Sequence, residues 1–287
     1  MRASTSTPGP TPPPLWEERL SCRYFATFAP RLAHPPHVES PAALAPFADV
    51  AVPRNQGRGP LAATWYETAG ARGAVLLLHP WVSWGRAYFH RRGRIEALRA
   101  AGYHALALDL AGFGESGPPA GFHDHDVEAG LAFLRARVPG LPLHLWGISS
   151  GGYWAHPVLS RDGGVAGAMF EDVAVHLLAW SWRMDLAGPL GYRLFPRLFP
   201  RSHRFLDLRR HAPLLRVRAA AYVSGERDRG VLPDETRELA ALASARCLVV
   251  PGAGHLTSIK VAPGDVIDLA LQTFALAAEG RPAGPGV

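Results

Sequence analysis

A serine flanked by glycines is the first feature of the chain with the spacing of a catalytic centre. Gly147, Ser149 and Gly151 form a Gly-x-Ser-x-Gly pattern between an apolar run and a helical pattern. A nucleophile on a sharp turn from strand to helix has neighbours that approach its backbone closely, so only small residues fit two positions away. Ser150 is the rival nucleophile, but no glycine lies two residues before it. The pattern predicts Ser149 as the nucleophile, although a Gly/Ser-rich turn without chemistry also fits it.

A histidine that can act as the base lies in a second glycine-rich loop. His255 follows Gly252 and Gly254, directly after the last apolar run of the chain. A lone histidine is usually structural, but a position at the end of a strand pattern is where ligands bind in sheets of parallel strands. We therefore predict His255 as the general base that takes a proton from Ser149.

Four signals along the chain together resemble those of the α/β-hydrolases. They are, in chain order, Leu78-His79-Pro80-Trp81, the segment Asp109-Leu110-Ala111-Gly112-Phe113-Gly114-Glu115-Ser116, the serine turn, and the loops that carry the acid and the histidine. The resemblance covers roughly residues 61–280. It implies a catalytic triad in the order Ser, Asp, His, as in serine esterases and lipases. Because this superfamily has many activities, the resemblance identifies the machinery more firmly than the substrate.

The resemblance also implies which residue is the acid of the triad. Family members commonly carry it three residues after the glycine of a turn, which maps from Gly225 onto Asp228. The acid fixes one tautomer of the imidazole and stabilises the imidazolium formed during attack. Two alternatives are Glu226, in the same turn, and Asp172, after the preceding apolar run. Asp228 also fits a surface ion pair with a neighbouring arginine.

Two main-chain N–H groups are expected to form the oxyanion hole. The resemblance implies that one belongs to Ser150, the residue after the nucleophile, and the other to Trp81. Many family members have glycine where this chain has Pro80. Proline removes its own donor but leaves that of Trp81.

Apolar runs and helical patterns alternate along the part of the chain that must position these residues. The runs predict strands near 62–67, 73–79, 103–109, 142–148, 165–171, 219–224 and 246–251. The helical patterns fill 86–101, 124–137, 150–160, 234–244 and 264–278. Several runs are apolar throughout, which is typical of strands covered on both faces. We therefore predict the α/β class, with the α/β-hydrolase fold and a mostly parallel, doubly wound sheet.

The interval 175–212 interrupts this alternation and predicts a short helical lid insertion. It is rich in aromatic residues and arginine and has no strand signal. An inserted lid explains such an interval better than one long loop. Trp180 and Trp182 are expected either to line a substrate pocket or to pack on the core.

An N-terminal extension, residues 1–60, precedes the hydrolase domain, which is expected at 61–280. The extension divides into a mobile start at 1–14, an amphipathic helix ending before Pro30, and a proline-rich connector at 31–60. The helix is expected to dock on its own domain, with a membrane or a partner as the alternative. Residues 281–287 are expected to be a flexible tail.

One motif resembles a metal cluster, and the sequence favours another role for it. His123-Asp124-His125-Asp126 precedes a helical pattern, so Asp124 or Asp126 is expected to be the N-cap. No second group with zinc spacing accompanies the motif, and no metal site is predicted. His79 is expected to be a structural residue of its loop.

The composition of the chain excludes several classes of protein. Apolar residues make up 48% of the 287 residues and charged residues 19%, which fits a soluble globular protein. The net charge is +6, but no nucleic-acid-binding motif accompanies it. The only cysteines, Cys22 and Cys247, form no disulfide framework, and Cys247 is expected to be buried. Neither a secretory signal nor a membrane-spanning run is apparent, so we expect a cytoplasmic protein without stable membrane insertion.

These observations predict a serine hydrolase that cleaves an ester or related acyl bond of a small molecule without a cofactor. An acyltransferase would use the same triad, with an alcohol or amine in place of water. A non-catalytic binding protein of the same fold is the third reading, which would not require all three triad residues. The aromatic residues of the lid favour an apolar acyl or alcohol group, and its arginines allow an anionic one.

Overall fold

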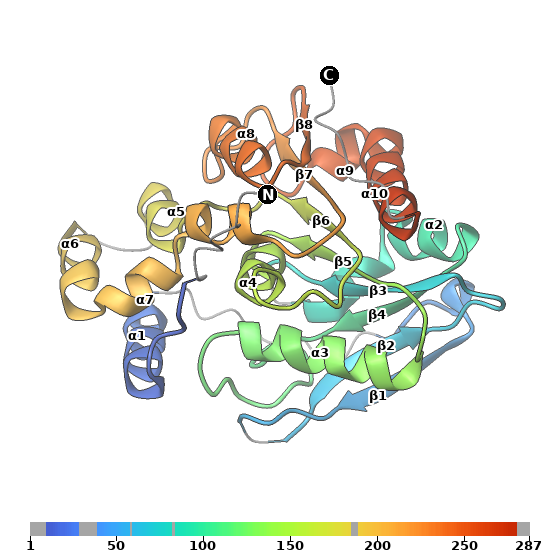
Figure 1. Ribbon diagram of the computed structural model, residues 1–287, viewed down its shortest axis with the longest axis horizontal. Coiled ribbons are helices and arrows are strands. Elements are labelled where there is room, and N and C mark those ends of the chain that lie inside the picture. Colours follow the sequence, from blue (N-terminus) through green and yellow to red (C-terminus); the bar gives the residue numbers. More distant parts are fainter. Residues whose placement is uncertain (1–9, 29–38, 58, 82–83, 185–188, 280–287) are drawn as a thin grey trace, which may run out of the picture.

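The computed structural model describes residues 10–28, 39–57, 59–81, 84–184 and 189–279 (Figure 1). Most of the start expected to be mobile, 1–14, lies outside these ranges, and so does the whole tail 281–287. The core of the molecule is an eight-stranded sheet with helices on both faces (Figure 1).

Seven of the eight strands coincide with the predicted ones. They are β2 (Leu61–Tyr66), β3 (Gly73–Leu78), β4 (Tyr103–Leu108), β5 (Leu143–Ile148), β6 (Gly167–Glu171), β7 (Ala219–Gly225) and β8 (Arg246–Val250). The strand order is β1-β2-β4-β3-β5-β6-β7-β8. β2 is antiparallel to both of its neighbours, and β4, β3, β5, β6, β7 and β8 are mutually parallel. The predicted fold class, a mostly parallel sheet of the α/β-hydrolase type, is confirmed.

The sheet begins earlier than predicted. β1 (Phe47–Val52) lies inside the segment 31–60 that was expected to be a connector, and it pairs antiparallel with β2. The short 3-10 helix η1 (Ala42–Leu44) precedes it. The prolines around β1 hid this strand, since proline is common in connectors and tolerated beside an edge strand. An edge strand pairs on one side only, and most of β1 is exposed or half-buried.

The sheet separates two hydrophobic cores because side chains alternate along each strand. In β3, Val75 and Leu77 belong to one core, whereas Ala74, Leu76 and Leu78 belong to the other. The first core contains residues of α2 (Arg94–Ala100), α9 (Ser258–Val261) and α10 (Pro263–Ala278). The second contains residues of α3 (Asp124–Arg137), α4 (Ser150–Leu159) and α8 (Pro233–Leu242). The fully apolar sequence of β3 follows from burial on both faces.

The interval 175–212 is helical, as predicted, and lies between β6 and β7. It contains α5 (Leu177–Arg183), α6 (Pro189–Leu198), α7 (Pro200–Phe205) and the short 3-10 helix η3 (Leu208–Arg210), and η4 (Ala212–Leu214) follows. We call residues 175–212 the insertion. Its helices lie at the left of Figure 1, and α10 and α2 lie at the right.

The N-terminal helix α1 (Leu15–Phe28) docks on its own chain, beside the insertion (Figure 1). Glu17 accepts hydrogen bonds from the N–H groups of Arg201 and Ser202 at 2.8 and 2.7 Å, at the start of α7. The Tyr24 hydroxyl donates to the carbonyl of Gly191 at 2.7 Å. Among the described residues, no helix is long and apolar enough to cross a membrane.

The prediction for Cys247 is wrong. This residue is exposed rather than buried, although it belongs to an apolar run. β8 is the last strand of the sheet, so its side chains are covered less completely than those of the central strands. Cys247 and Cys22 are both free, in agreement with the absence of a disulfide framework.

Candidate active site

The turn that carries Ser149 has the strained geometry expected of a nucleophile elbow. Ser149 joins β5 to α4 with φ +48° and ψ −113°, a conformation that few non-glycine residues adopt. A Cβ atom at Gly147 would lie 2.5 Å from the Cα of Gly152, and one at Gly151 would lie 2.4 Å from the carbonyl oxygen of Leu78. The two flanking glycines are therefore required by space, which is the reason that the motif predicts the turn.

The structure brings the three predicted triad residues together from three separate loops. The hydroxyl oxygen of Ser149 lies 3.3 Å from Nε2 of His255, and Nδ1 of His255 lies 2.7 Å from a carboxylate oxygen of Asp228. The loops after β7 and β8 approach so closely that a Cβ at Gly225 would lie 2.4 Å from the carbonyl oxygen of Ala253. Because Gly225 has no side chain, the loops that carry Asp228 and His255 can approach each other this closely.

The surroundings of Asp228 fix the direction of its carboxylate. One oxygen accepts hydrogen bonds from the N–H groups of Gly230 and Val231, both at 2.9 Å. The other oxygen faces His255, and the side chain is fully buried. Burial by itself lowers the pKa of His255, but the hydrogen bond and charge of Asp228, with the charge of Asp172, raise the pKa above its ordinary value.

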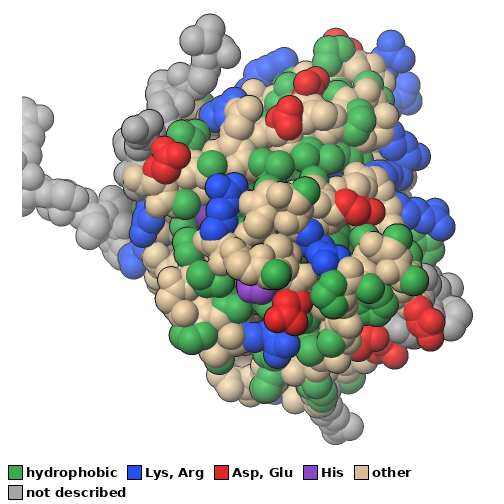
Figure 2. Space-filling view, turned by 90° about the vertical axis from the view of Figure 1, so that its right-hand side faces the viewer, with side chains coloured by type: hydrophobic (Ala, Val, Ile, Leu, Met, Phe, Trp, Pro, Cys, Tyr) green, Lys and Arg blue, Asp and Glu red, His purple; other side chains and the backbone are tan. Residues whose placement is uncertain are grey.

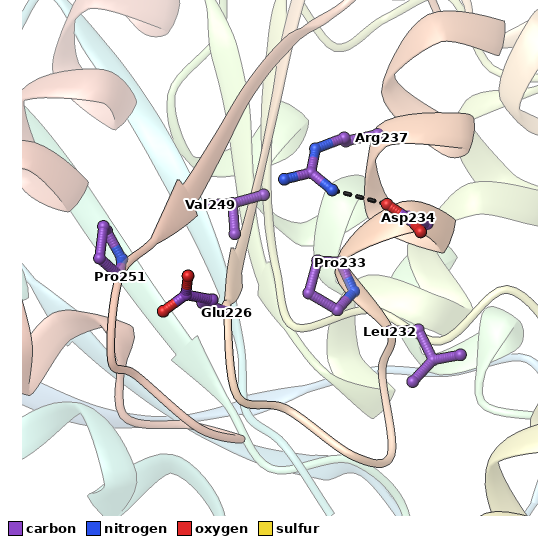
Figure 3. A pocket seen from close by; sticks show the side chains of 7 residues that line it. All are labelled: Glu226, Leu232, Pro233, Asp234, Arg237, Val249 and Pro251. Carbon is purple, nitrogen blue, oxygen red and sulfur yellow. Dashed lines mark hydrogen bonds and ion pairs between the residues drawn. The ribbon is translucent and has the colours of Figure 1, made fainter.

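The carboxylate of Glu226, the alternative acid, is hydrogen-bonded to the main chain rather than to the ring of His255. Its carboxylate accepts the N–H of Gly252 at 2.9 Å, and its side chain lines a cavity of about 510 Å³ between the loops after β7 and β8 and the start of α8. Figure 3 shows this cavity, in which Arg237 pairs with Asp234. No triad residue lines it. The other alternative acid, Asp172, lies near His255 without a hydrogen bond to its ring.

The main-chain donors predicted for the oxyanion hole belong to Ser150, the residue after the serine, and to Trp81, in the loop after β3. The N–H groups of Trp81 and Ser150 donate to no other group in the described part of the chain. His79 is buried and uses both ring nitrogens on main-chain groups: Nδ1 lies 2.7 Å from the carbonyl oxygen of Pro80, and Nε2 accepts the N–H of Leu110 at 3.0 Å. As expected, His79 acts as a structural residue that holds the loop before Trp81.

The two tryptophans of the insertion occupy different environments. Trp180 is half-buried, and a Cβ atom at Gly230, in the loop after Asp228, would lie 3.0 Å from its indole nitrogen. Trp182 is 45% exposed and contacts the ring of Tyr192, with 5.4 Å between the ring centroids. Arg183 joins this part of the insertion to α8 through an ion pair with Glu235. Trp180 therefore lies near the loop that carries Asp228.

The prediction of an N-cap at Asp124 or Asp126 is wrong. His123 occupies the N-cap position of α3 without a capping side-chain bond, and both aspartates lie in the first turn. Asp126 instead accepts the N–H of Ala111 at 2.9 Å and lies 2.8 Å from Nδ1 of His123. Tertiary contacts to the loop after β4 determine these roles, and the sequence pattern does not reveal them.

Two groups of side chains in the described residues have the spacing of metal ligands. Ligand atoms of Glu18, Asp124 and His125 lie within 4.8 Å of one another, and so do those of Asp172, Asp228 and His255. In the first group His125 pairs with Glu18 at 3.2 Å, and Asp124 pairs with Arg161 at 2.8 Å. These ion pairs balance the negative charges of Glu18 and Asp124. The absence of a metal stays a prediction.

The fold and the strained serine turn define an α/β-hydrolase. A family model described as serine aminopeptidase, S33 matches residues 69–244, more than half of the chain. The chain therefore belongs to this family.

Solved structures similar to this chain include several esterases. An esterase from Pyrococcus furiosus superposes with a TM-score of 0.69 at 21% identity, over 86% of this chain and 98% of that one. A carboxyl esterase from Bacillus coagulans gives a TM-score of 0.63 at 16% identity, over 81% of this chain and 99% of that one. An esterase from Thermogutta terrifontis gives 0.57 at 19% identity, over 80% and 99%. At such identities these likenesses establish the shared fold.

Proposed function

We propose that this protein is a serine hydrolase that cleaves an ester or related acyl bond through an acyl-enzyme intermediate. The observation that carries the proposal is the continuous chain of contacts from Ser149 through His255 to the buried carboxylate of Asp228. Catalysis on this arrangement needs a nucleophile, a base and an orienting acid, and all three side chains lie in that order.

In the first step, Nε2 of His255 takes the proton of Ser149 while the serine oxygen attacks the carbonyl carbon of the substrate. Asp228 accepts the hydrogen bond of Nδ1–H, which fixes the tautomer and stabilises the imidazolium. The negative oxygen of the tetrahedral intermediate rests on the N–H groups of Ser150 and Trp81. The imidazolium then protonates the leaving alcohol, and the acyl group stays on Ser149.

In the second step, water attacks the acyl-enzyme with His255 again as base, which releases the acid and restores the serine. These steps use side chains and main-chain donors of this chain, and we propose that no cofactor takes part. Trp180 and Trp182 are proposed to contact the part of the substrate remote from the carbonyl.

The expected substrate is a small acyl compound rather than a nucleic acid. Over the middle of the face shown in Figure 2, Lys and Arg side chains are interspersed with acidic and apolar ones, and several more lie along its right-hand edge. Nucleic-acid binding depends on clustered positive charge. The absence of a nucleic-acid partner is part of this proposal.

Covalent labelling tests whether Ser149 is an activated nucleophile. A fluorophosphonate probe should add to the protein once, on the peptide that contains Ser149, and Ser149→Ala should remove the label. A folded wild-type protein that the probe does not modify would support the binding-protein reading instead.

A substrate panel separates the remaining reactions. We expect turnover of 4-nitrophenyl esters that differ in chain length and charge, and slower turnover of aminoacyl 4-nitroanilides. Product analysis with added alcohols tests acyl transfer, since a transferase yields the new ester in preference to the free acid. Faster cleavage of the anilides would favour an aminopeptidase, the activity named in the description of the matching family.

A further inference from the structure

A second carboxyl group lies beside the proposed catalytic histidine. Asp172 directly follows β6 and is completely buried. A carboxylate oxygen of Asp172, one of Asp228 and a ring nitrogen of His255 lie within 4.8 Å of one another. Of the two carboxylates, only that of Asp228 accepts a hydrogen bond from the ring, whereas Asp172 accepts one from the main chain.

Asp172 holds the loop of the base through the main chain. One carboxylate oxygen accepts the N–H of Leu256, the residue after His255, at 2.8 Å. The carbonyl of Leu256 accepts a hydrogen bond from Arg92 at 3.2 Å. Leu256 has φ +59°, which is unfavourable for a side chain of this kind. These two bonds therefore keep Leu256 in a conformation that directs the neighbouring imidazole toward Ser149.

The position of Asp172 is unfavourable on its own account, which indicates a role beyond packing. Its φ is +50°, and its other carboxylate oxygen is buried without a hydrogen-bond partner. Burying a charged oxygen without a partner is costly. A positive charge nearby offsets this cost, and the proposed mechanism creates such a charge on His255 in each step.

We propose that Asp172 is a positioning residue of this hydrolase, which anchors the His255 loop through Leu256 and provides a second negative charge for the imidazolium. The inference rests on the proposed function, since only proton transfer to His255 gives the second carboxylate its role. Asp228 orients the ring of His255 by a hydrogen bond. Asp172 acts on the same ring through its charge and through its hydrogen bond to the main chain of Leu256.

Several charged and titratable groups face Asp172 from the elements around it. They are His255 after β8, Asp228 after β7, Glu171 in β6, Arg94 in α2 and Tyr88 in the 3-10 helix η2 (Gly85–His90). Burial raises the pKa of Asp172 to about 7, and the charge of His255 opposes this effect. Asp172 and His255 lie close enough to each other for the protonation of one to affect the protonation of the other.

The isosteric variant Asp172→Asn removes the charge but retains an oxygen that can accept the Leu256 N–H. Because an ionised Asp172 raises the pKa of His255, the acidic limb of kcat/KM should move to lower pH by about 0.5–1 unit. Asp172→Ala also loses the anchor, and its kcat should fall by about 10- to 100-fold. Glu226→Gln is the matched control, since this acid lies in the neighbouring loop and contacts Gly252 rather than the base.

A pair of variants tests whether the two acids act on the same imidazolium. Asp228→Asn should retain part of its activity through Asp172, and Asp228→Asn/Asp172→Asn should lose a further factor of about 10. A residue that only packs the loop would leave the pH profile of Asp172→Asn unchanged. An unmoved profile together with an equal kcat in the single and double Asp228 variants would overturn the inference.

An NMR titration of the wild-type protein requires neither turnover nor a variant. It therefore tests the role of Asp172 independently of the proposed function. In the wild type, NMR signals of the His255 ring and of the Asp172 carboxyl carbon should each show two coupled titration steps. Independent single steps would contradict the coupling even if esters are cleaved. Coupled steps in a protein that cleaves no ester and takes no probe would instead refute the proposed hydrolase and the catalytic role of Asp172.

Discussion

At the scale of single residues, the two adjacent serines of the turn have hydroxyl groups in different environments. Ser149 has a strained backbone and contacts the imidazole, whereas the hydroxyl of Ser150 is buried and makes no hydrogen bond in the described residues. Only the main-chain N–H of Ser150 has a proposed role. A side-chain substitution at each position therefore tests different parts of the site.

We expect Ser149→Ala to lower kcat by about 10⁴-fold or more, because the members of a triad act as a unit. Ser150→Ala should cost much less, since its N–H is retained. Ester turnover measures both effects, and thermal melting checks that each variant folds. An active Ser149 variant beside an inactive Ser150 variant would show that the turn has been assigned wrongly.

The pH dependence of the reaction follows from the protonation of His255. A general base must be neutral to accept a proton, so kcat/KM should rise as the imidazole loses its proton. The charge of Asp228 raises the pKa of His255, which places this rise above the ordinary value of about 6.5. Rates measured across the weakly acidic to neutral range test this, and a flat or falling profile would eliminate His255 as the base.

At the scale of elements, the N-terminal helix and the insertion form one unit. Glu17 of α1 accepts two N–H groups at the start of α7, where a negative charge is favourable. Glu17→Ala should lower the free energy of unfolding by about 1–3 kcal/mol, because it leaves two N–H groups without an acceptor. Urea denaturation measures the change. Arg19→Ala, on the exposed side of the same helix, is the control and should change stability by less than about 0.5 kcal/mol.

Within the insertion, burial distinguishes residues of the core from residues proposed to contact substrate. Phe195 is fully buried against Tyr24 and Phe199, so Phe195→Ala should cost about 3–5 kcal/mol of stability. Shortening 178–208 to a small loop would remove this core contact and is expected to unfold the protein. The insertion therefore has to be tested by single substitutions.

Trp182→Ala should leave the melting temperature nearly unchanged, since this side chain is 45% exposed. We expect the variant to shift the preference among esters of different chain length while it retains turnover of a small activated ester. Trp180→Ala should change the ester preference more strongly, because its indole lies near the loop that carries Asp228. Identical ester preferences in both variants and the wild type would refute the proposed substrate contact.

At the scale of the whole molecule, a buried ion pair links one face of the sheet to the serine turn. Arg94 of α2 pairs with Glu171 of β6 at 2.6 Å, and Trp146 of β5 donates to the same carboxylate at 2.5 Å. The carbonyl of Glu171 accepts the N–H of Ser149 at 2.7 Å. The sheet and the elbow therefore share one buried network.

We expect Glu171→Leu to lower stability by about 3–5 kcal/mol, because it leaves the charge of Arg94 buried without a partner. The double variant Arg94→Met/Glu171→Leu removes both charges and should recover much of this loss. Denaturation of the two variants measures the difference. Equal stabilities would show that the ion pair is not the cause.

The sequence determined the features that depend on local spacing. The apolar runs predicted seven strands because a strand covered on both faces has no polar alternation. The Gly-x-Ser-x-Gly spacing predicted the serine turn, since Gly147 and Gly151 have no space for a side chain. Such constraints act between residues a few positions apart, so the pattern alone contains them.

The tertiary structure decided the features that depend on contacts between distant segments. β1 escaped detection because an edge strand pairs on one side and its flanks are rich in proline. The sequence left Asp228, Glu226 and Asp172 as candidate acids, and it is the close approach of the loops at Gly225 and Ala253 that directs Asp228 to the ring. Asp172, which follows β6, also lies beside His255. Residues 172, 228 and 255 meet only because parallel strands end at one edge of the sheet, an arrangement that no local spacing encodes.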